Sequence, residues 1–244
     1  MSSGDTFETA SDPGEVGRED HNATDRFVVN VSNALSWIYP MLMLAIVAQV
    51  CLRSAGHNQA WLDDFQWWLY GLAGMVGLAY AVTTNSHVRV DIFHAGFDDR
   101  KKAWIEIFGL AWLFLPFIIL MWDVNFHYTY QSVLNNEGSD SPNGLHRLWL
   151  LKCAINVIFM FVAVAIFAAY RRNLDRVLEP NEFHMALFAL PSTLFVVNLA
   201  VYYLIYWWVF MTGGPDLNAR RITREPIFDY TIEITAVATV LLLV

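Results

Sequence analysis

The sequence predicts an all-α integral membrane protein, a helical bundle, and two observations support this class. Hydrophobic residues make up 56% of the 244 residues and charged residues only 16%, which is too apolar for an ordinary soluble domain of this length. A helix needs about 20 apolar residues to cross a bilayer, and several stretches of roughly that length lack Asp, Glu, Lys and Arg. The bilayer itself is therefore an expected partner.

Five membrane spans are expected from these stretches, and a sixth is left open. The five are Phe27–Leu52, Phe65–Val88, Ile107–Trp122 with its apolar flanks, Cys153–Tyr170, and Phe183–Leu190 continuing past Pro191 to Thr212. The sixth candidate runs from about Ile227 to Val244 and carries Asp229 and Glu233 in its first half. At about 1.5 Å per residue it barely crosses the core, so a boundary helix and a short span remain alternatives.

The distribution of Lys and Arg predicts which side faces the cytoplasm. When the spans are threaded alternately, nine of the 15 Lys and Arg residues fall on one side: Arg18, Arg26, Arg89, Arg100, Lys101, Lys102, Arg171, Arg172 and Arg176. Positive charge accumulates in cytoplasmic loops, so this side and the N-terminus are expected inside. Arg220, Arg221 and Arg224 lie on the opposite side and reduce the difference in positive charge between the two sides.

Residues 1–26 are acidic and poor in apolar residues, without the layout of a signal peptide. We expect them to form a disordered cytoplasmic tail. Much of the net charge of −8 comes from this tail. A negative charge gives no reason to expect a nucleic-acid partner.

Patterns for catalysis or cofactor binding are not apparent. The seven histidines lie in the tail, in loops or near span ends, whereas a haem or di-iron bundle would need histidines at mid-depth on facing helices. His87 and His94 are seven residues apart, and Arg89 between them would repel a cation. Nucleophile motifs and phosphate-binding glycine loops are missing as well. We therefore expect no metal, no cofactor and no enzymatic activity.

Charged residues near membrane depth are the remaining candidates, because they are costly there and are usually paired or used. Asp123 ends the third span and Lys152 begins the fourth on the same side, so the two could form an intramembrane pair. We favour a role in anchoring and helix registration over an ion pathway, because Asp123 and Lys152 both lie near span ends.

A polar segment follows the second span. His87, Arg89 and Asp91 lie where that span leaves the bilayer on the basic side, so they can bond to one another, to loop backbone and to phosphate headgroups. We hypothesise that Asp91 and Arg89 fix the end of the second helix, with His87 as a further donor.

Four motifs follow one another along the chain. "VAQVCLR" ends the first span at Arg53, and "AWLDDFQWWLYGLAGMVG" places Trp61, Asp63 and Asp64 before a glycine-rich second span. Asp63 and Asp64 could pair with Arg53 across the short loop or simply face water. An exposed pair of this kind is worth only about 0 to 1 kcal/mol.

The third motif is "NSHVRVDIF", with His87, Val90 and Asp91. The fourth, "GSDSPNGLHRLWLLKCAI", contains Ser141, Pro142, Gly144, Leu145, Trp149 and Lys152. In this order and spacing, over about residues 30–176, the motifs resemble the small membrane subunit, the DctQ type, of tripartite ATP-independent periplasmic (TRAP) transporters.

The resemblance implies a bacterial inner-membrane protein with two protein partners, a large TRAP membrane subunit and a periplasmic substrate-binding protein. The large subunit carries an organic acid by symport with sodium or another cation, and the small subunit is non-catalytic and scaffolds it. The resemblance divides the chain into the tail (1–26), a four-helix membrane domain (27–176) and a C-terminal extension (177–244) with one or two further helices. Two alternatives remain: a self-sufficient small channel or carrier, and an assembly subunit of another membrane complex.

Overall fold

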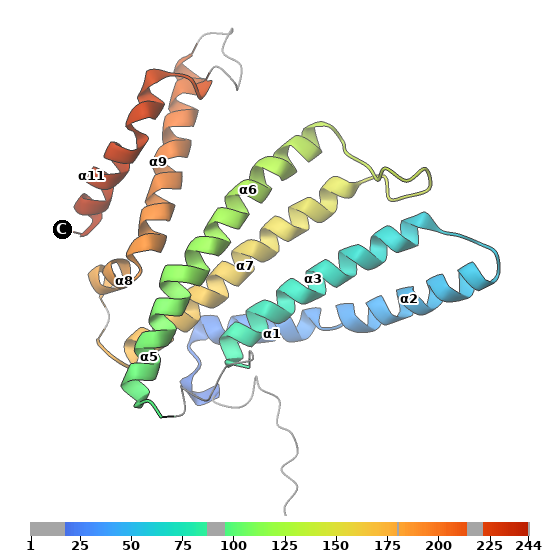
Figure 1. Ribbon diagram of the computed structural model, residues 1–244, viewed down its shortest axis with the longest axis horizontal. Helices are drawn as coiled ribbons and strands as arrows, with labels where there is room; N and C mark the ends of the chain where they lie inside the picture. Colours follow the sequence, from blue (N-terminus) through green and yellow to red (C-terminus); the bar gives the residue numbers. More distant parts are fainter. Residues whose placement is uncertain (1–17, 87–95, 180, 214–221, 244) are drawn as a thin grey trace, which may run out of the picture. The chain divides into compact units, whose positions relative to one another are not determined.

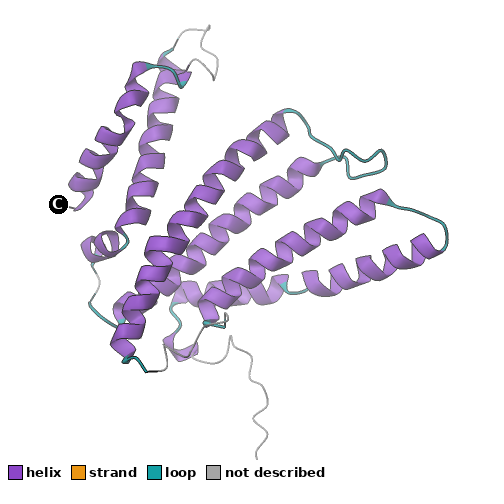
Figure 2. Cartoon of the chain, viewed as in Figure 1, coloured by secondary structure: helices purple, strands orange, loops and turns teal. Residues whose placement is uncertain are grey.

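A computed structural model describes residues 18–86, 96–179, 181–213 and 222–243, and within these ranges the ordered elements are helices without any strand (Figures 1 and 2). The all-α class expected from the sequence is confirmed. The chain divides into two compact units, which are described separately below. The first contains Met1–Phe97 and Met121–Arg172, and the second contains Asp98–Leu120 and Asn173–Val244.

The described elements are helices and short helical turns. In order they are η1 (Arg18–Asp20), α1 (Ala23–Leu35), α2 (Ile38–Ser54), α3 (Ala60–Thr84), α5 (Asp99–Phe108), the π-helical turn η2 (Gly109–Phe114), α6 (Leu115–Leu134), α7 (Leu148–Asp175), α8 (Glu182–Phe188), α9 (Leu190–Thr212), η3 (Pro226–Tyr230) and α11 (Thr231–Leu243).

Five helical segments in the described part of the chain are long and apolar enough to cross a membrane: Ala23–Ser54, Asp99–Leu134, Leu148–Asp175, Leu190–Thr212 and Pro226–Leu243. The last is the segment that the sequence left open, and its length and composition place it among the candidates. The expected span Phe65–Val88 lies largely in α3, which is not among the five. Its tryptophan, tyrosine, glycine and threonine residues make α3 less apolar, although its 25 residues measure about 37 Å.

Two of the expected spans are interrupted by proline. Pro40 lies in the first turn of α2, where its ring would clash with the carbonyl of residue 36 in a continuous helix, and the chain breaks between α1 and α2. The expected segment from Phe183 to Thr212 is likewise two helices, because α9 restarts with Pro191 in its first turn. Proline fits the first turn of a helix, where its missing N–H costs nothing.

Helix α1 begins inside the range expected to be a tail. Asn22 accepts a hydrogen bond from the Asp25 amide at 2.8 Å, and the Asp25 carboxylate accepts one from the Asn22 amide at 3.1 Å. This reciprocal capping box satisfies two donors that would otherwise be unpaired at the helix start. Residues 1–17 lie outside the described part, so the disordered tail stays a prediction for them.

Helices α2 and α3 form a hairpin in the first unit, where they lie side by side (Figure 1). Ala73 and Ala79 of α3 are buried, and small side chains allow close helix approach. The Tyr39 hydroxyl of α2 donates to the Ala73 carbonyl at 3.1 Å and lies 3.1 Å from where a side chain on Gly77 would begin. A larger residue at Gly77 would displace this contact.

Helices α9 and α11 form a second hairpin in the second unit. Asn198 of α9 donates to the Thr235 hydroxyl of α11 at 3.2 Å. The base of the hairpin is held to the π-helical turn, because the Ser192 hydroxyl donates to the Ala111 carbonyl and the Trp112 indole donates to the Phe188 carbonyl at 2.8 Å. A π-helical turn disturbs the regular hydrogen-bond ladder, and Ser192 supplies a donor there.

We expect Asn22→Ala to lower stability by about 1 kcal/mol, because the capping side chain is lost. The check is the midpoint of thermal unfolding of the purified protein in detergent. Asn33→Ala is the control, since Asn33 is an exposed residue within the same helix. Equal effects of the two substitutions would contradict a capping role.

Candidate functional site

Arg172, in the last turn of α7, joins three helices of the first unit. Its Nη1 lies 2.8 Å from Asp25 Oδ2 in the first turn of α1, and its Nη2 donates to the Thr83 carbonyl near the end of α3 at 2.9 Å. Only 6% of the Arg172 side chain and none of the Asp25 side chain is exposed. A carboxylate at a helix start and a cation at a helix end also suit the helix dipoles.

Two further polar residues, Asn22 and His21, lie beside this ion pair. Asn22 Nδ2 donates to the Ala168 carbonyl of α7 at 3.4 Å, which adds a second link between α1 and α7. His21 is buried beside the pair, and burial, followed by the nearby Arg172 cation, holds the pKa of its imidazole below the ordinary value of 6.5. The ring is therefore neutral at neutral pH and adds no second cation to the site.

The ion pair also bears on which helix ends share a side of the bundle. The threading of the spans assigned Arg18, Arg26 and Arg171–Arg176 to one side of the membrane. The structure brings the start of α1 and the end of α7 together at one end of the first unit, as that threading requires.

A second cluster surrounds Lys152, near the start of α7. Lys152 Nζ forms an ion pair with Glu137, which follows α6, and lies 3.5 Å from the ring centroid of Tyr128. Asn156, one turn further along α7, donates to the Thr129 hydroxyl at 2.6 Å. The cluster fastens α7 to α6 and to the loop between them.

The sequence proposed a different partner for Lys152, namely Asp123. The Thr129 hydroxyl donates to the Lys152 carbonyl at 3.3 Å, so Lys152 is level with Thr129 on the neighbouring helix. Asp123 precedes Thr129 by six residues, or about 9 Å of helix. The recorded ion pair of Lys152 is with Glu137, and the pair with Asp123 stays a prediction.

The Lys152 ammonium holds the pKa of Glu137 below its ordinary value of 4.5, chiefly through their hydrogen bond. Glu137 lies in the loop, outside the membrane-spanning segments. A carboxyl whose folded pKa is depressed stabilises the fold above its unfolded pKa. This contribution is lost as the pH falls below 4.5 and through the lower folded value.

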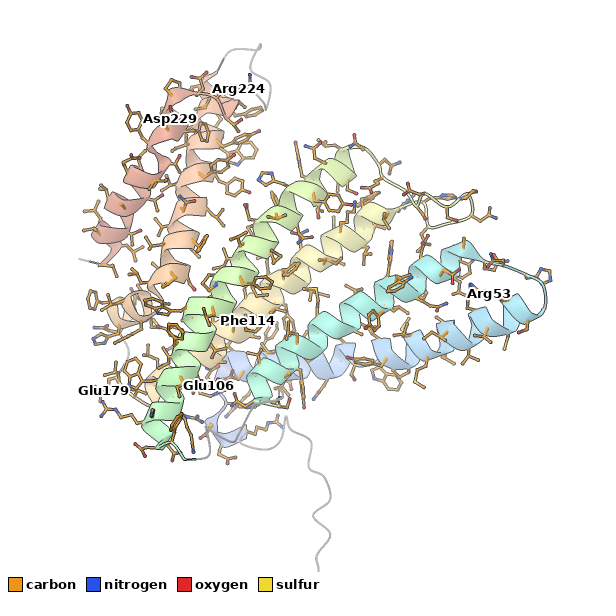
Figure 3. The ribbon with its side chains drawn as sticks, in the orientation of Figure 1. Arg53, Glu106, Phe114, Glu179, Arg224 and Asp229 are labelled. Carbon is orange, nitrogen blue, oxygen red and sulfur yellow. The ribbon has the colours of Figure 1, made fainter. Side chains whose placement is uncertain are left out.

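Asp63 and Asp64, adjacent at the start of α3, make different contacts. Asp63 Oδ1 lies 3.4 Å from Arg53 Nη2 and accepts a hydrogen bond from Gln49 Nε2 at 2.8 Å. This ion pair is exposed, with 62% of the Arg53 side chain and 43% of the Asp63 side chain accessible. Arg53 stands at the far end of α2, beside the α2–α3 connection (Figure 3).

Asp64 instead holds the loop between α6 and α7. Its Oδ2 accepts a hydrogen bond from the Leu145 amide at 3.0 Å. A side chain on Gly144 would begin 2.6 Å from the same oxygen and 2.3 Å from the Ser139 hydroxyl, so only glycine fits there without displacement. Of the two carboxylates, Asp64 therefore makes the long-range contact.

The remaining motif residues have simpler positions. The Trp61 indole donates to Gln59 Oε1 at 3.2 Å, and the Trp149 indole donates to Asn136 Oδ1 at 3.1 Å. His87, Arg89 and Asp91 lie outside the described residues, so their hypothesised role at the end of the second helix stays a prediction.

Sequence reasoning missed Asp25, Arg172 and Glu137 as contact-forming residues. The capping pattern in "HNATD" was a usable signal for Asp25. The sequence offered no comparable signal for its pairing with Arg172, which lies 147 residues further along. In the described residues, no group of three or more His, Cys, Asp or Glu could hold a metal ion, and Cys51 and Cys153 are free thiols.

We expect Arg172→Gln to destabilise the protein by about 3–5 kcal/mol, because it leaves a buried carboxylate without its cation. Arg53→Gln is the matched control and should cost about 0–1 kcal/mol, since its ion pair is exposed. Thermal unfolding in detergent measures both. Similar losses would show that the buried pair does not hold the three helices together.

We expect Glu137→Gln to lower the unfolding midpoint at neutral pH, because the ion pair with Lys152 is lost. The difference from wild type should shrink as the pH falls below 4.5, since wild-type Glu137 then becomes protonated as well. Unfolding scans across this pH range provide the measurement. A difference independent of pH would contradict a charge-based contribution.

Comparison with known proteins adds to this geometry. The family model of the DctQ component of tripartite ATP-independent periplasmic transporters matches residues 42–176, more than half of the chain. Comparisons with curated proteins and with solved structures give no match. The match begins within α2 and covers α3, α5, η2, α6 and α7, with the contacts of Asp63, Asp64 and Lys152. The chain therefore belongs to the DctQ family, the small membrane subunits of TRAP transporters.

Proposed function

We propose that this chain is a non-catalytic permease subunit of a TRAP-type secondary transporter for an organic acid, and that it scaffolds the large transport subunit. Family membership supports the transporter assignment. The scaffolding role rests on how the chain pairs the charges near the two ends of α7.

One observation carries the scaffolding role: Arg172 binds the helices of its own unit. It bonds α1 and α3 at once from its place on α7. A charge that moves an ion or a substrate must exchange partners during transport, whereas separating a buried ion pair is strongly destabilising. A rigid unit is what a larger moving subunit requires as a fixed support.

The spacing of the charges on α7 agrees with this role. Lys152 and Arg172 are 20 residues apart on one helix, or about 30 Å, which is close to the thickness of the hydrocarbon core. Each is paired near one end of the unit. The two pairs fix the register of α7 in the bilayer and tie its neighbours to it.

The proposed partners are the large TRAP membrane subunit, a periplasmic substrate-binding protein and the lipid bilayer. We place the protein in the bacterial inner membrane, with residues 1–26 as a cytoplasmic tail. We assign residues 27–176 to the membrane domain, of which the family model matches 42–176. Residues 177–244 form an extension that lies outside the family match.

The test is uptake of a radiolabelled panel of organic acids into proteoliposomes under a sodium gradient. We expect uptake only when this chain, the large subunit and the binding protein are all present, because the large subunit requires both the binding protein and the support of this chain. This chain alone and the other two proteins without it are the controls. Uptake by this chain alone would instead support a self-sufficient carrier and direct mutagenesis to Asp123, Lys152 and Glu233.

A further inference from the structure

An apolar groove of about 610 Å³ lies along η3 and the exposed face of α11. Its apolar lining consists of Ile227, Tyr230, Ile234, Val237, Ala238 and Leu241. Tyr230, Val237 and Leu241 each expose 60% or more of their surface. The face is therefore not used for packing within the described part of this chain.

The spacing of these residues is that of a helix-packing seam. On α11 the bulky members Ile234, Val237 and Leu241 recur at intervals of three and four residues, and Ile227 and Tyr230 precede them on η3. Spacing of three and four residues along an α-helix places side chains on one face, where they can pack against a neighbouring helix. Ala238 provides a small position between Ile234 and Leu241, where a partner side chain can enter.

The α9–α11 hairpin is held together by other residues of α11. Thr231, Thr235 and Thr239 are buried, and Thr235 accepts the hydrogen bond from Asn198 of α9. They follow one another at four-residue intervals and so share a helix face. The groove residues are thus available for a second helix while the hairpin stays intact.

Glu233 is an exposed carboxylate at the groove. It lies seven residues after Pro226 and ten before Leu243, near the middle of this candidate span. Charges at this depth are costly in lipid and are usually paired, yet none of the described residues forms an ion pair with Glu233. It directly precedes Ile234 and so flanks the apolar face, and charges beside such a face can form ion pairs between helices and select the partner.

We propose that this face of α11 binds a transmembrane helix of the large transport subunit that carries a Lys or Arg opposite Glu233. This inference rests on the proposed function and assigns the C-terminal extension to the same interface. Lipid chains supply no counter-charge. A second copy fits poorly, because the only charged residues of Pro226–Leu243 are Asp229 and Glu233, and two acidic faces repel each other. Asp229 and Arg224 lie at the α9–α11 turn (Figure 3), away from the middle of the helix.

The experiment is affinity purification of the full chain after co-expression with its large subunit, with a photo-reactive residue at Val237 in the groove. We expect wild-type chain to retain the large subunit and Val237 to cross-link to it. Glu233→Gln should reduce the retained large subunit by more than about tenfold, since the opposing cation is left unpaired. Ile232→Gln is the control, because Ile232 is 76% exposed on α11 but does not line the groove.

The outcomes separate this inference from the proposed function. Retention by wild type and by Glu233→Gln alike, or cross-links from Val237 only to lipid or to a second copy, would overturn the inference and leave the proposed function standing. Loss of retention by Ile232→Gln to the same extent would also overturn it, because the effect would not be specific to the carboxylate. Failure of wild type itself to retain the large subunit would overturn the proposed function and the inference with it.

Discussion

The buried ion pair between Arg172 and Asp25 is the constraint on which the first unit depends. A guanidinium removed from water needs several acceptors, and here the acceptors come from a side chain of α1 and a carbonyl of α3. Because neither acceptor belongs to α7, satisfying Arg172 requires all three helix ends to meet. The apolar surfaces of the helices do not impose this by themselves, since lipid solvates such surfaces as well as another helix does.

Near the start of α7, Lys152 is likewise paired by groups that lie outside α7. Lys152 forms an ion pair with Glu137 and lies over the ring of Tyr128. The loop that carries Glu137 is also bound by Asp64, which accepts a hydrogen bond from the Leu145 amide of that loop. The loop between α6 and α7 is therefore held both by α7 and by α3. Polar contacts near each end of α7 leave its middle apolar, which is the distribution that a bilayer demands.

The second unit uses neutral polar groups where the first uses charges. Ser192 bonds the π-helical turn, and Asn198 bonds Thr235 inside the α9–α11 hairpin. Neutral groups of this kind hold helices together in lipid at modest cost. Glu233 differs from these neutral groups, because it is charged and exposed within a candidate span. On that combination we base the proposal of an interface at α11.

The sequence by itself determined the all-α membrane class and the family, because both follow from apolar run lengths and from motifs read along the chain. It missed the breaks at Pro40 and Pro191, which local proline chemistry could have indicated. Only the tertiary structure decided which charges meet: Asp25 with Arg172, Lys152 with Glu137, and Asp64 with the Leu145 amide. Such pairings depend on which helices are neighbours and at what depth each residue lies, and helix periodicity alone fixes neither of these.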